Sequence, residues 1–187
     1  DFAQLPEHRD RSLITPVENF GISFVDCTWE MNSASNGGAV QVMLFVNYTN
    51  SSFCFDDCTF KNNYIDGDHP FGMGSAVHVQ TEVVYNFAQA LTNLSKRIGG
   101  TLTNVSLIDV NFTFAKCWAI DNRNRVADGA FSFWMGLAVA YNLLVQFSHS
   151  VFTGNVAHWN GGAVSIVSPT PLDLQDPANT SKNITFR

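Results

Sequence analysis

Charged side chains are scarce in this sequence. Asp, Glu, Lys and Arg make up 14% of its 187 residues, well below the roughly 25% of an ordinary soluble domain. Ten basic residues stand against 16 acidic ones, which leaves a net charge of −6. A nucleic-acid-binding protein needs a basic stripe to neutralise phosphates, so the composition excludes that class. Other groups must keep the outer surface hydrated.

Clusters of side chains suited to catalysis or metal binding are also lacking. Residues 66–70 offer two carboxylates and an imidazole, but a calcium site needs six to eight oxygen ligands and a fuller loop pattern. A polar turn is the simpler interpretation. A second candidate is one outward row that could bind calcium or sugar, although a solvated face explains it better: Asp26, Asp57, Lys116 and His149. We therefore predict no catalytic residue, metal or cofactor.

One long apolar stretch carries no formal charge. Residues 129–150 exceed the roughly twenty residues that span a bilayer. Asn142 and Gln146 interrupt this stretch, and both of its ends fall in register with a repeat. Two buried strands joined by an apolar return explain it better than a membrane span.

What the sequence has is a unit repeated four times. The first copy contains Phe-Val-Asp-Cys-Thr-Trp-Glu-Met-Asn at 24–32 and Gly-Gly-Ala-Val at 37–40. Later copies close with related glycine motifs at 74–77, 128–131 and 161–164, and a fifth opens at 184–186. A period between twenty and fifty residues, with a tight Gly turn and one tolerated loop, is the signature of a solenoid.

The apolar pieces of the unit are expected to be strands. They are too short for helical periodicity, and they carry β-branched and aromatic side chains, which suit a pleated surface. The sequence therefore predicts an all-β single domain, 1–187, folded as a parallel β-helix. Rungs of such a coil lie roughly 4.8 Å apart, so equivalent residues stack into ladders.

The repeat also predicts the interior of this coil. An aromatic ladder is expected from Phe24, Phe55, Phe114, Phe147 and Phe186, and a second from Trp29, Phe60 and Phe152. An amide ladder is expected where the coil turns, from Asn32, Asn63, Asn122 and Asn155. Each amide can donate to the amide oxygen of the next rung, as in strands stacked in register. A row of Asn that binds a ligand is the alternative.

Three stretches depart from the repeat. Residues 85–100 place apolar side chains at helical spacing and end in two glycines, which predicts a short helical insertion packed on the coil. Residues 168–181 contain three prolines and predict an exposed loop. Residues 1–18 hold neither an initiator Met nor an apolar signal core, so we expect a mature or excerpted part of a longer chain.

Potential glycosylation sites are abundant. Seven of the 18 Asn stand in Asn-x-Ser/Thr sequons: Asn47, Asn50, Asn93, Asn104, Asn111, Asn179 and Asn183. The excess over chance predicts a secreted chain with N-linked glycans, and strand parity places Asn50 and Asn111 on the outside. The alternative is a polar β-rich chain that is simply rich in Asn and Ser.

Four cysteines add a weaker indication of an oxidising compartment. Cys27, Cys58 and Cys117 share one ladder position, which Ser150 fills in the fourth copy. Neighbouring rungs bring Cα atoms within disulfide range, which allows a Cys27–Cys58 disulfide, and packing of small residues is the alternative. Cys54 points outward and has no obvious partner.

Two short motifs resemble a known repeat. Phe-x-x-Asn at 60–63 and 152–155, together with Gly-Gly-Ala-Val at 37–40 and 161–164, is similar to the repeat of chlamydial polymorphic outer-membrane proteins and related β-helix surface proteins. The resemblance covers roughly residues 21–186 and departs at Ala119 and Asp128. It implies a right-handed parallel β-helix and a surface role. The four copies and the start of a fifth predict about four to five rungs.

Together these features predict a non-catalytic structural or adhesive extracellular glycoprotein, as a segment or subunit of a filament or surface coat. Its partners would be further copies, neighbouring β-helix chains, or cell-surface glycans or proteins, without nucleic acid or a membrane span. A polysaccharide lyase or glycoside hydrolase is the alternative, because β-helices often present a groove to sugars. Those enzymes need converging carboxylates, and often Arg or Lys, on one face, and few of the 10 basic residues of this chain lie in the repeated unit.

Overall fold

A computed structural model describes residues 16–35, 37–44, 46–65, 72–81, 105–135, 138–167 and 182–186. Every strand pairing in these segments is parallel, and none of the described residues is helical. The predicted helical insertion at 85–100, the predicted loop at 168–181 and the polar turn at 66–70 lie outside the described residues.

The strands form four sheets, which we call A to D. Sheet A contains β1 (Val17–Glu18), β2 (Gly21–Val25), β6 (Tyr48–Asp56), β10 (Val105–Ala115), β14 (Ala138–Tyr141), β15 (Leu143–Ser148) and β19 (Lys182–Phe186). Sheet B contains β3 (Thr28–Glu30), β7 (Thr59–Lys61), β11 (Trp118–Ile120) and β16 (Val151–Thr153). Sheet C contains β4 (Ser33–Ala34), β8 (Tyr64–Ile65), β12 (Arg123–Asn124) and β17 (Val156–Ala157). Sheet D contains β5 (Val40–Met43), β9 (Val77–Gln80), β13 (Phe131–Trp134) and β18 (Val164–Val167).

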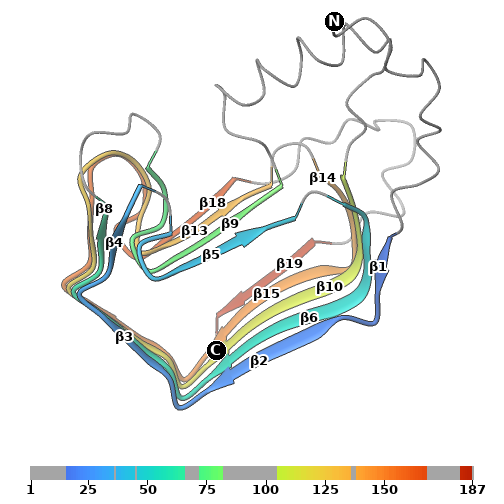
Figure 1. Cartoon of the computed structure of the whole chain (residues 1–187), viewed down its shortest axis with the longest axis horizontal. Coiled ribbons are helices and arrows are strands. Elements are labelled where there is room, and N and C mark those ends of the chain that lie inside the picture. The colour runs from blue at the N-terminus through green and yellow to red at the C-terminus, as the bar shows by residue number, and fades with distance from the viewer. Residues whose placement is uncertain are drawn as a thin grey trace, which may run out of the picture.

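Each copy of the repeat runs through sheets A, B, C and D in that order and pairs with the next copy (Figure 1). This path is consistent with a parallel β-helix. The described part of the chain has no helix long and apolar enough to cross a bilayer. Residues 131–134, 138–141 and 143–148 of the uncharged stretch are strands of this coil.

The strand register is the register of the sequence repeat. Phe24, Phe55, Phe114 and Phe147 are successive Cα partners, and Phe186 is the partner of Phe147. The first three ring pairs stack with centroids 5.0, 4.8 and 4.8 Å apart. Each well-placed ring pair contributes roughly 0.5–1.5 kcal/mol beyond area burial. The ladder therefore fixes the register while it fills the core.

The corners between sheets A and B and between sheets B and C are single residues with positive φ. Between sheets A and B these are Asp26, Asp57, Lys116 and His149, with φ between 51° and 54°, and all four are exposed. Between sheets B and C they are Met31, Asn62, Asp121 and Gly154. This backbone region strains most side chains and is tolerated best by Gly, Asn and Asp. The row that contains Asp26 and Asp57 is thus a row of corner residues.

The glycine motif is explained by close backbone contact between copies. A Cβ added to Gly38 would lie 2.2 Å from the carbonyl oxygen of Ser75, and one added to Gly129 would lie 1.9 Å from that of Gly161. Gly38 and Gly129 therefore have no space for a side chain, whereas Ser75 fills the same position of the second copy. Asp128 replaces the first glycine in the third copy and is not among the residues with positive φ.

Candidate functional site

The four repeated asparagines form one hydrogen-bonded ladder. The Nδ2 of Asn32 donates to the Oδ1 of Asn63 at 2.9 Å, Asn63 to Asn122 at 3.0 Å, and Asn122 to Asn155 at 2.9 Å. The second N–H of Asn63, Asn122 and Asn155 donates to a backbone carbonyl of the preceding copy. Because the amides bond one another and the backbone, this row stabilises the coil and offers little to a ligand.

The cysteines form a second polar ladder. Cys58 Sγ donates to the carbonyl oxygen of Phe24, and Cys117 Sγ to that of Phe55, both at 3.4 Å. Ser150 Oγ makes the equivalent bond to Phe114 at 3.2 Å. All four cysteines are free thiols, so the Cys27–Cys58 disulfide that the sequence allows is not formed. Burial raises the pKa of Cys117 to about 12 and raises that of Cys58.

The sequons lie at different positions of the coil. Asn47 and Asn50 are exposed, while Asn111 is half-buried on β10. The Oδ1 of Asn47 accepts the backbone N–H of Ser106 at 2.9 Å, and the Nδ2 of Asn50 donates to the Oδ1 of Asn19 at 2.6 Å. Asn183 lies on β19. The remaining sequons are outside the described residues: Asn93, Asn104 and Asn179.

Histidine, serine and aspartate come together on sheet D. His78 and Ser132 are Cα partners, and both are buried. Burial lowers the pKa of His78, whose Nε2 lies 2.8 Å from the Oε1 of Gln80. A serine nucleophile needs its hydroxyl on the base, but the hydroxyl of Ser132 donates to Asp128 at 3.4 Å. Within the described residues no group of three or more His, Cys, Asp or Glu is placed to hold a metal ion.

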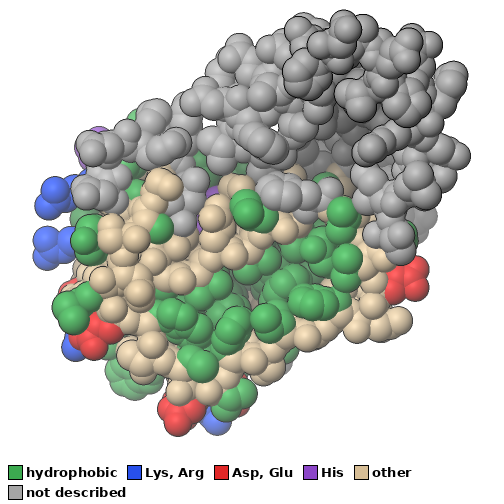
Figure 2. All heavy atoms as spheres, viewed as in Figure 1, with side chains coloured by type: hydrophobic (Ala, Val, Ile, Leu, Met, Phe, Trp, Pro, Cys, Tyr) green, Lys and Arg blue, Asp and Glu red, His purple; other side chains and the backbone are tan. Residues whose placement is uncertain are grey.

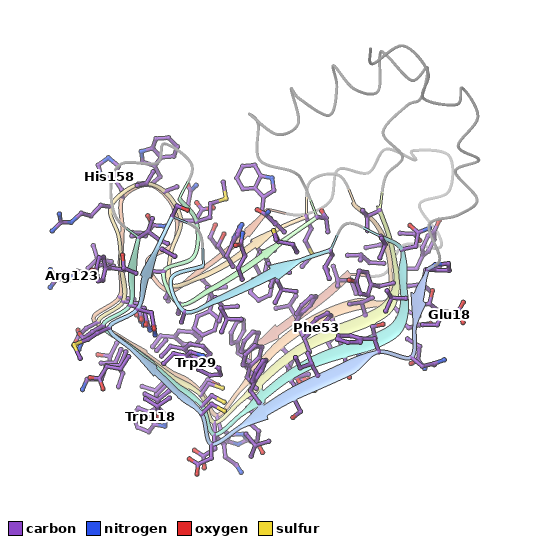
Figure 3. The ribbon with its side chains drawn as sticks, in the orientation of Figure 1. Glu18, Trp29, Phe53, Trp118, Arg123 and His158 are labelled. Carbon is purple, nitrogen blue, oxygen red and sulfur yellow. The ribbon has the colours of Figure 1, made fainter. Side chains whose placement is uncertain are left out.

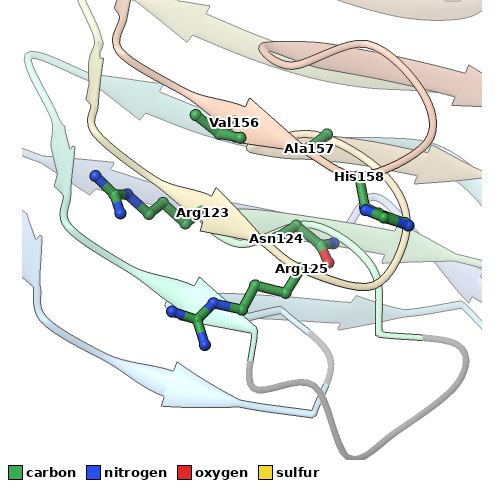
Figure 4. A pocket seen from close by; sticks show the side chains of 6 residues that line it. All are labelled: Arg123, Asn124, Arg125, Val156, Ala157 and His158. Carbon is green, nitrogen blue, oxygen red and sulfur yellow. The ribbon is translucent and has the colours of Figure 1, made fainter.

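A hollow of about 390 Å³ lies on sheet C, next to the loops that follow β12 and β17. Its lining consists of Arg123, Asn124, Arg125, Val156, Ala157 and His158. The two guanidinium groups extend to one side of it and His158 stands on the other (Figure 4). Blue side chains also gather along the edge of the molecule where β4 and β8 lie in the same view (Figure 2).

The loop that carries Arg125 is held by the buried amide of Asn124. The Oδ1 of Asn124 accepts the backbone N–H groups of Val126 and Ala127 at 2.9 and 3.1 Å. Its Nδ2 donates to the carbonyl oxygens of Asp128 and Gly72 at 2.6 and 2.9 Å. All the hydrogen-bonding capacity of this amide is used inside the protein. Asn124 therefore positions the loop and is not free to bind a ligand.

The loop that carries His158 is fixed to its neighbour in the third copy. The backbone N–H of Trp159 donates to the carbonyl oxygen of Ala127 at 3.1 Å, and the Nδ2 of Asn160 donates to the Oδ1 of Asp128 at 2.9 Å. The side chain of Trp159 is nevertheless 66% exposed. The indole of Trp159, whose ring centroid lies 6.5 Å from that of the lining residue His158, is thus presented to solvent by a tethered loop.

A second hollow, of about 460 Å³, shares Arg123 and Arg125 with the first. It is also lined by Asn62, Asn63, Tyr64, Ile65 and Asp121. Tyr64 is the Cα partner of Arg123 on the neighbouring strand β8. The one ion pair found among the described residues, Lys61 with Glu30 at 3.0 Å, lies elsewhere on sheet B. Neither Arg123 nor Arg125 is neutralised by a carboxylate within the described part of the chain.

Sequence reasoning missed this site because its arginines do not belong to the repeated pattern. Arg125 and His158 do follow β12 and β17 at the same offset, since Asn124 is the Cα partner of Ala157. Two basic residue types, Arg and His, at equivalent positions of successive copies were the available signal. The labelled side chains confirm that Arg123 and His158 lie on the outside of the coil, whereas Trp29 lies inside it (Figure 3).

Comparison with known proteins gives one match. Residues 149–166 match the model of the Chlamydia polymorphic membrane protein repeat. The fourth copy is similar to that repeat. The match begins at the corner residue His149 and ends within β18, so it covers strands of sheets B, C and D and confirms the resemblance inferred from the motifs. No curated protein and no solved structure matches the chain.

Proposed function

We propose that this chain is a stretch of right-handed parallel β-helix, of four to five rungs, in a non-catalytic adhesive protein of the cell surface. The similarity of residues 149–166 to a repeat of chlamydial membrane proteins supports the surface location. The ladders of Phe and Asn support a structural scaffold, because they stiffen the coil without creating a reaction centre. Any N-linked glycans would add to the hydration of its weakly charged surface.

The observation that carries the proposal is the cationic hollow on sheet C. A binding surface needs exposed groups on a rigid scaffold, and Arg123, Arg125 and Trp159 satisfy that need. Cleavage of a glycosidic bond uses two carboxyl groups that flank it, whereas the lining of this hollow contains no carboxylate. The composition of the hollow therefore favours binding over polysaccharide hydrolysis.

The first copy favours assembly with further coil. Strands β3, β4 and β5 are edge strands of their sheets, and Ile22, Val25 and Met31 are 37%, 60% and 70% exposed. Figure 2 shows apolar side chains gathered at this end of the coil. Such an edge pairs readily with another strand. The Oδ1 of Asn32 accepts no hydrogen bond from the described residues, so it offers an acceptor to a neighbouring amide ladder.

A paired assay tests the adhesive function. Beads coated with the purified chain are incubated with cultured eukaryotic cells and, separately, with acidic and neutral polysaccharides. We expect the beads to be retained on cells and the polysaccharides to keep their length. Depolymerisation would reject the non-catalytic role in favour of a lyase or hydrolase, and equal retention by beads coated with heat-unfolded chain would reject specific adhesion.

Assembly has its own test. Ile22→Lys places a charge inside the open end of the coil, where it should prevent another strand from pairing. Ile108→Lys makes the same change at a residue that is 36% exposed in the third copy. In sedimentation velocity, growth with concentration should be lost in Ile22→Lys and kept in Ile108→Lys. A wild-type chain that stays monomeric at every concentration would reject self-association.

A further inference from the structure

The geometry points to a specific class of ligand for the hollow on sheet C: we propose that it binds an acidic saccharide. Arg123 and Arg125 would contact the anionic group, and Tyr64 and Trp159 would contact the sugar faces. This inference rests on the proposed adhesive function and names what that function recognises. The two hollows that share these arginines would form one binding surface.

The charge of the hollow selects an anion. The lining of the first hollow carries two guanidinium groups and one imidazole and has no acidic side chain. The second hollow adds one carboxylate, that of Asp121. A guanidinium offers several N–H donors in a planar fork that matches a carboxylate or sulfate group. This concentration of positive charge is unusual in a chain with 10 basic and 16 acidic residues. The net charge of −6 disfavours nucleic acid, which needs a longer row of basic residues to neutralise its phosphates.

The shape and the aromatic groups favour a saccharide over a small free anion. Both hollows are shallow and open, and together they extend across β8, β12 and β17. Tyr64 and Trp159 are 43% and 66% exposed, and each presents a flat apolar ring with a polar edge. Such rings contact the apolar face of a sugar while the guanidinium groups and the exposed amide of Asn62 bond its hydroxyls. A lone phosphate or sulfate would leave these rings without a role.

The surface is organised before a ligand arrives. Asn124 fixes the loop of Arg125 through four hydrogen bonds. Asn160 and the backbone of Trp159 tie the next loop to the first. Arg123 stands on a strand that is paired on both sides. Because binding need not order the backbone of these loops, more of the contact energy contributes to affinity.

Binding of defined polysaccharides tests the inference. Biolayer interferometry would compare polygalacturonate, which carries carboxylates, and dextran sulfate, which carries sulfates, with neutral dextran. The wild-type chain should bind at least one acidic probe, and Arg125→Gln and Arg123→Gln should each weaken that binding about tenfold. Lys116→Gln is the matched control, since it removes one exposed positive charge of the same copy at a corner. It should leave the binding unchanged.

The remaining outcomes are decisive. Trp159→Ala should weaken polysaccharide binding, whereas it should leave retention of inorganic sulfate unchanged. Binding of neutral dextran as tight as that of the acidic probes, or an equal effect of Lys116→Gln and Arg125→Gln, would overturn the inference. If coated beads still adhere to cells while no acidic probe binds, the ligand class is wrong and the adhesive function stands. If the beads do not adhere to cells and no acidic probe binds, both proposals fail.

Discussion

Phe131 supplies the aromatic ring that Ala119 lacks. Ala119 lies between Phe60 and Phe152 in sheet B, where the ladder would otherwise continue with a ring. The ring of Phe131, from sheet D, meets Phe60 and Phe152 edge-on with centroids 5.3 and 5.6 Å away. Its Cα partners are Val77 and Val164. A large residue in sheet D thus compensates for a small one in sheet B of the same copy.

This compensation predicts coupling between the two positions. Ala119→Phe should destabilise the protein by roughly 1–3 kcal/mol, because the added ring overpacks a filled core. Adding Phe131→Val restores the arrangement of the second copy, so the double variant should be more stable than the sum of the single effects, by about 0.5–3 kcal/mol. Urea unfolding of the four proteins measures this cycle. Additive changes would show that the two residues do not share one space.

The phenylalanine ladder predicts a large cost at its centre. Phe55 is 1% exposed and stacks between Phe24 and Phe114, so Phe55→Ala should cost roughly 3–5 kcal/mol. Asp57→Gly is the control, since Asp57 is an exposed corner with φ of 54° that glycine adopts easily. Its effect should stay below about 0.5 kcal/mol. Comparable losses of stability in the two variants would contradict the ladder.

The repeat predicted the register because equivalent residues of a solenoid must stack. The alignment of Phe24 with Phe55 is the strand pairing seen in sheet A. The alignment of Asn32 with Asn63 is the hydrogen-bonded pair at the corner between sheets B and C. Corners were not predictable in the same way. Lys116 and Met31 adopt positive φ, a conformation that their side chains do not favour, because the coil imposes it. The cationic hollow arises from loops, whose positions depend on hydrogen bonds such as those of Asn124.

The asparagine ladder predicts a difference between its middle and its end. Asn63 is fully buried, accepts from the backbone N–H and Nδ2 of Asn32, and donates to Trp29 and Asn122. Asn63→Ala leaves several of these groups unpaired, each at a cost of roughly 1–3 kcal/mol. Asn32→Ala should cost less, because Asn32 is only half-buried and its side chain donates one hydrogen bond within the ladder, to Asn63. Guanidinium unfolding curves measure the free energy of unfolding of both variants. An equal loss in the two would show that burial does not set the contribution of each amide to stability.

Glycan occupancy is expected to follow exposure in a eukaryotic secretory host. Asn47 and Asn50 are exposed and should be modified more fully than Asn111, which is half-buried on β10. Asn47→Gln and Asn50→Gln should each remove one glycan mass from the intact protein. Glycopeptide mass spectrometry gives the occupancy of each site. Unmodified peptides at both exposed positions would reject the glycoprotein prediction for this part of the chain.

Cys117 predicts a loss of stability at alkaline pH. Burial raises its pKa from an ordinary value of 9.0 to about 12, so the folded protein keeps the thiol protonated over a range in which the unfolded chain ionises it. The stabilisation is complete below pH 9 and declines as the pH rises towards 12, because proton release then favours the unfolded state. Cys117→Ser should remove this contribution while it keeps the fold, since Ser150 already makes the equivalent hydrogen bond to the preceding copy. Urea midpoints measured at pH 8, 9, 10 and 11 should therefore fall more steeply for the wild type than for Cys117→Ser. Parallel curves would show that this thiol ionises as readily in the folded protein as in the unfolded one.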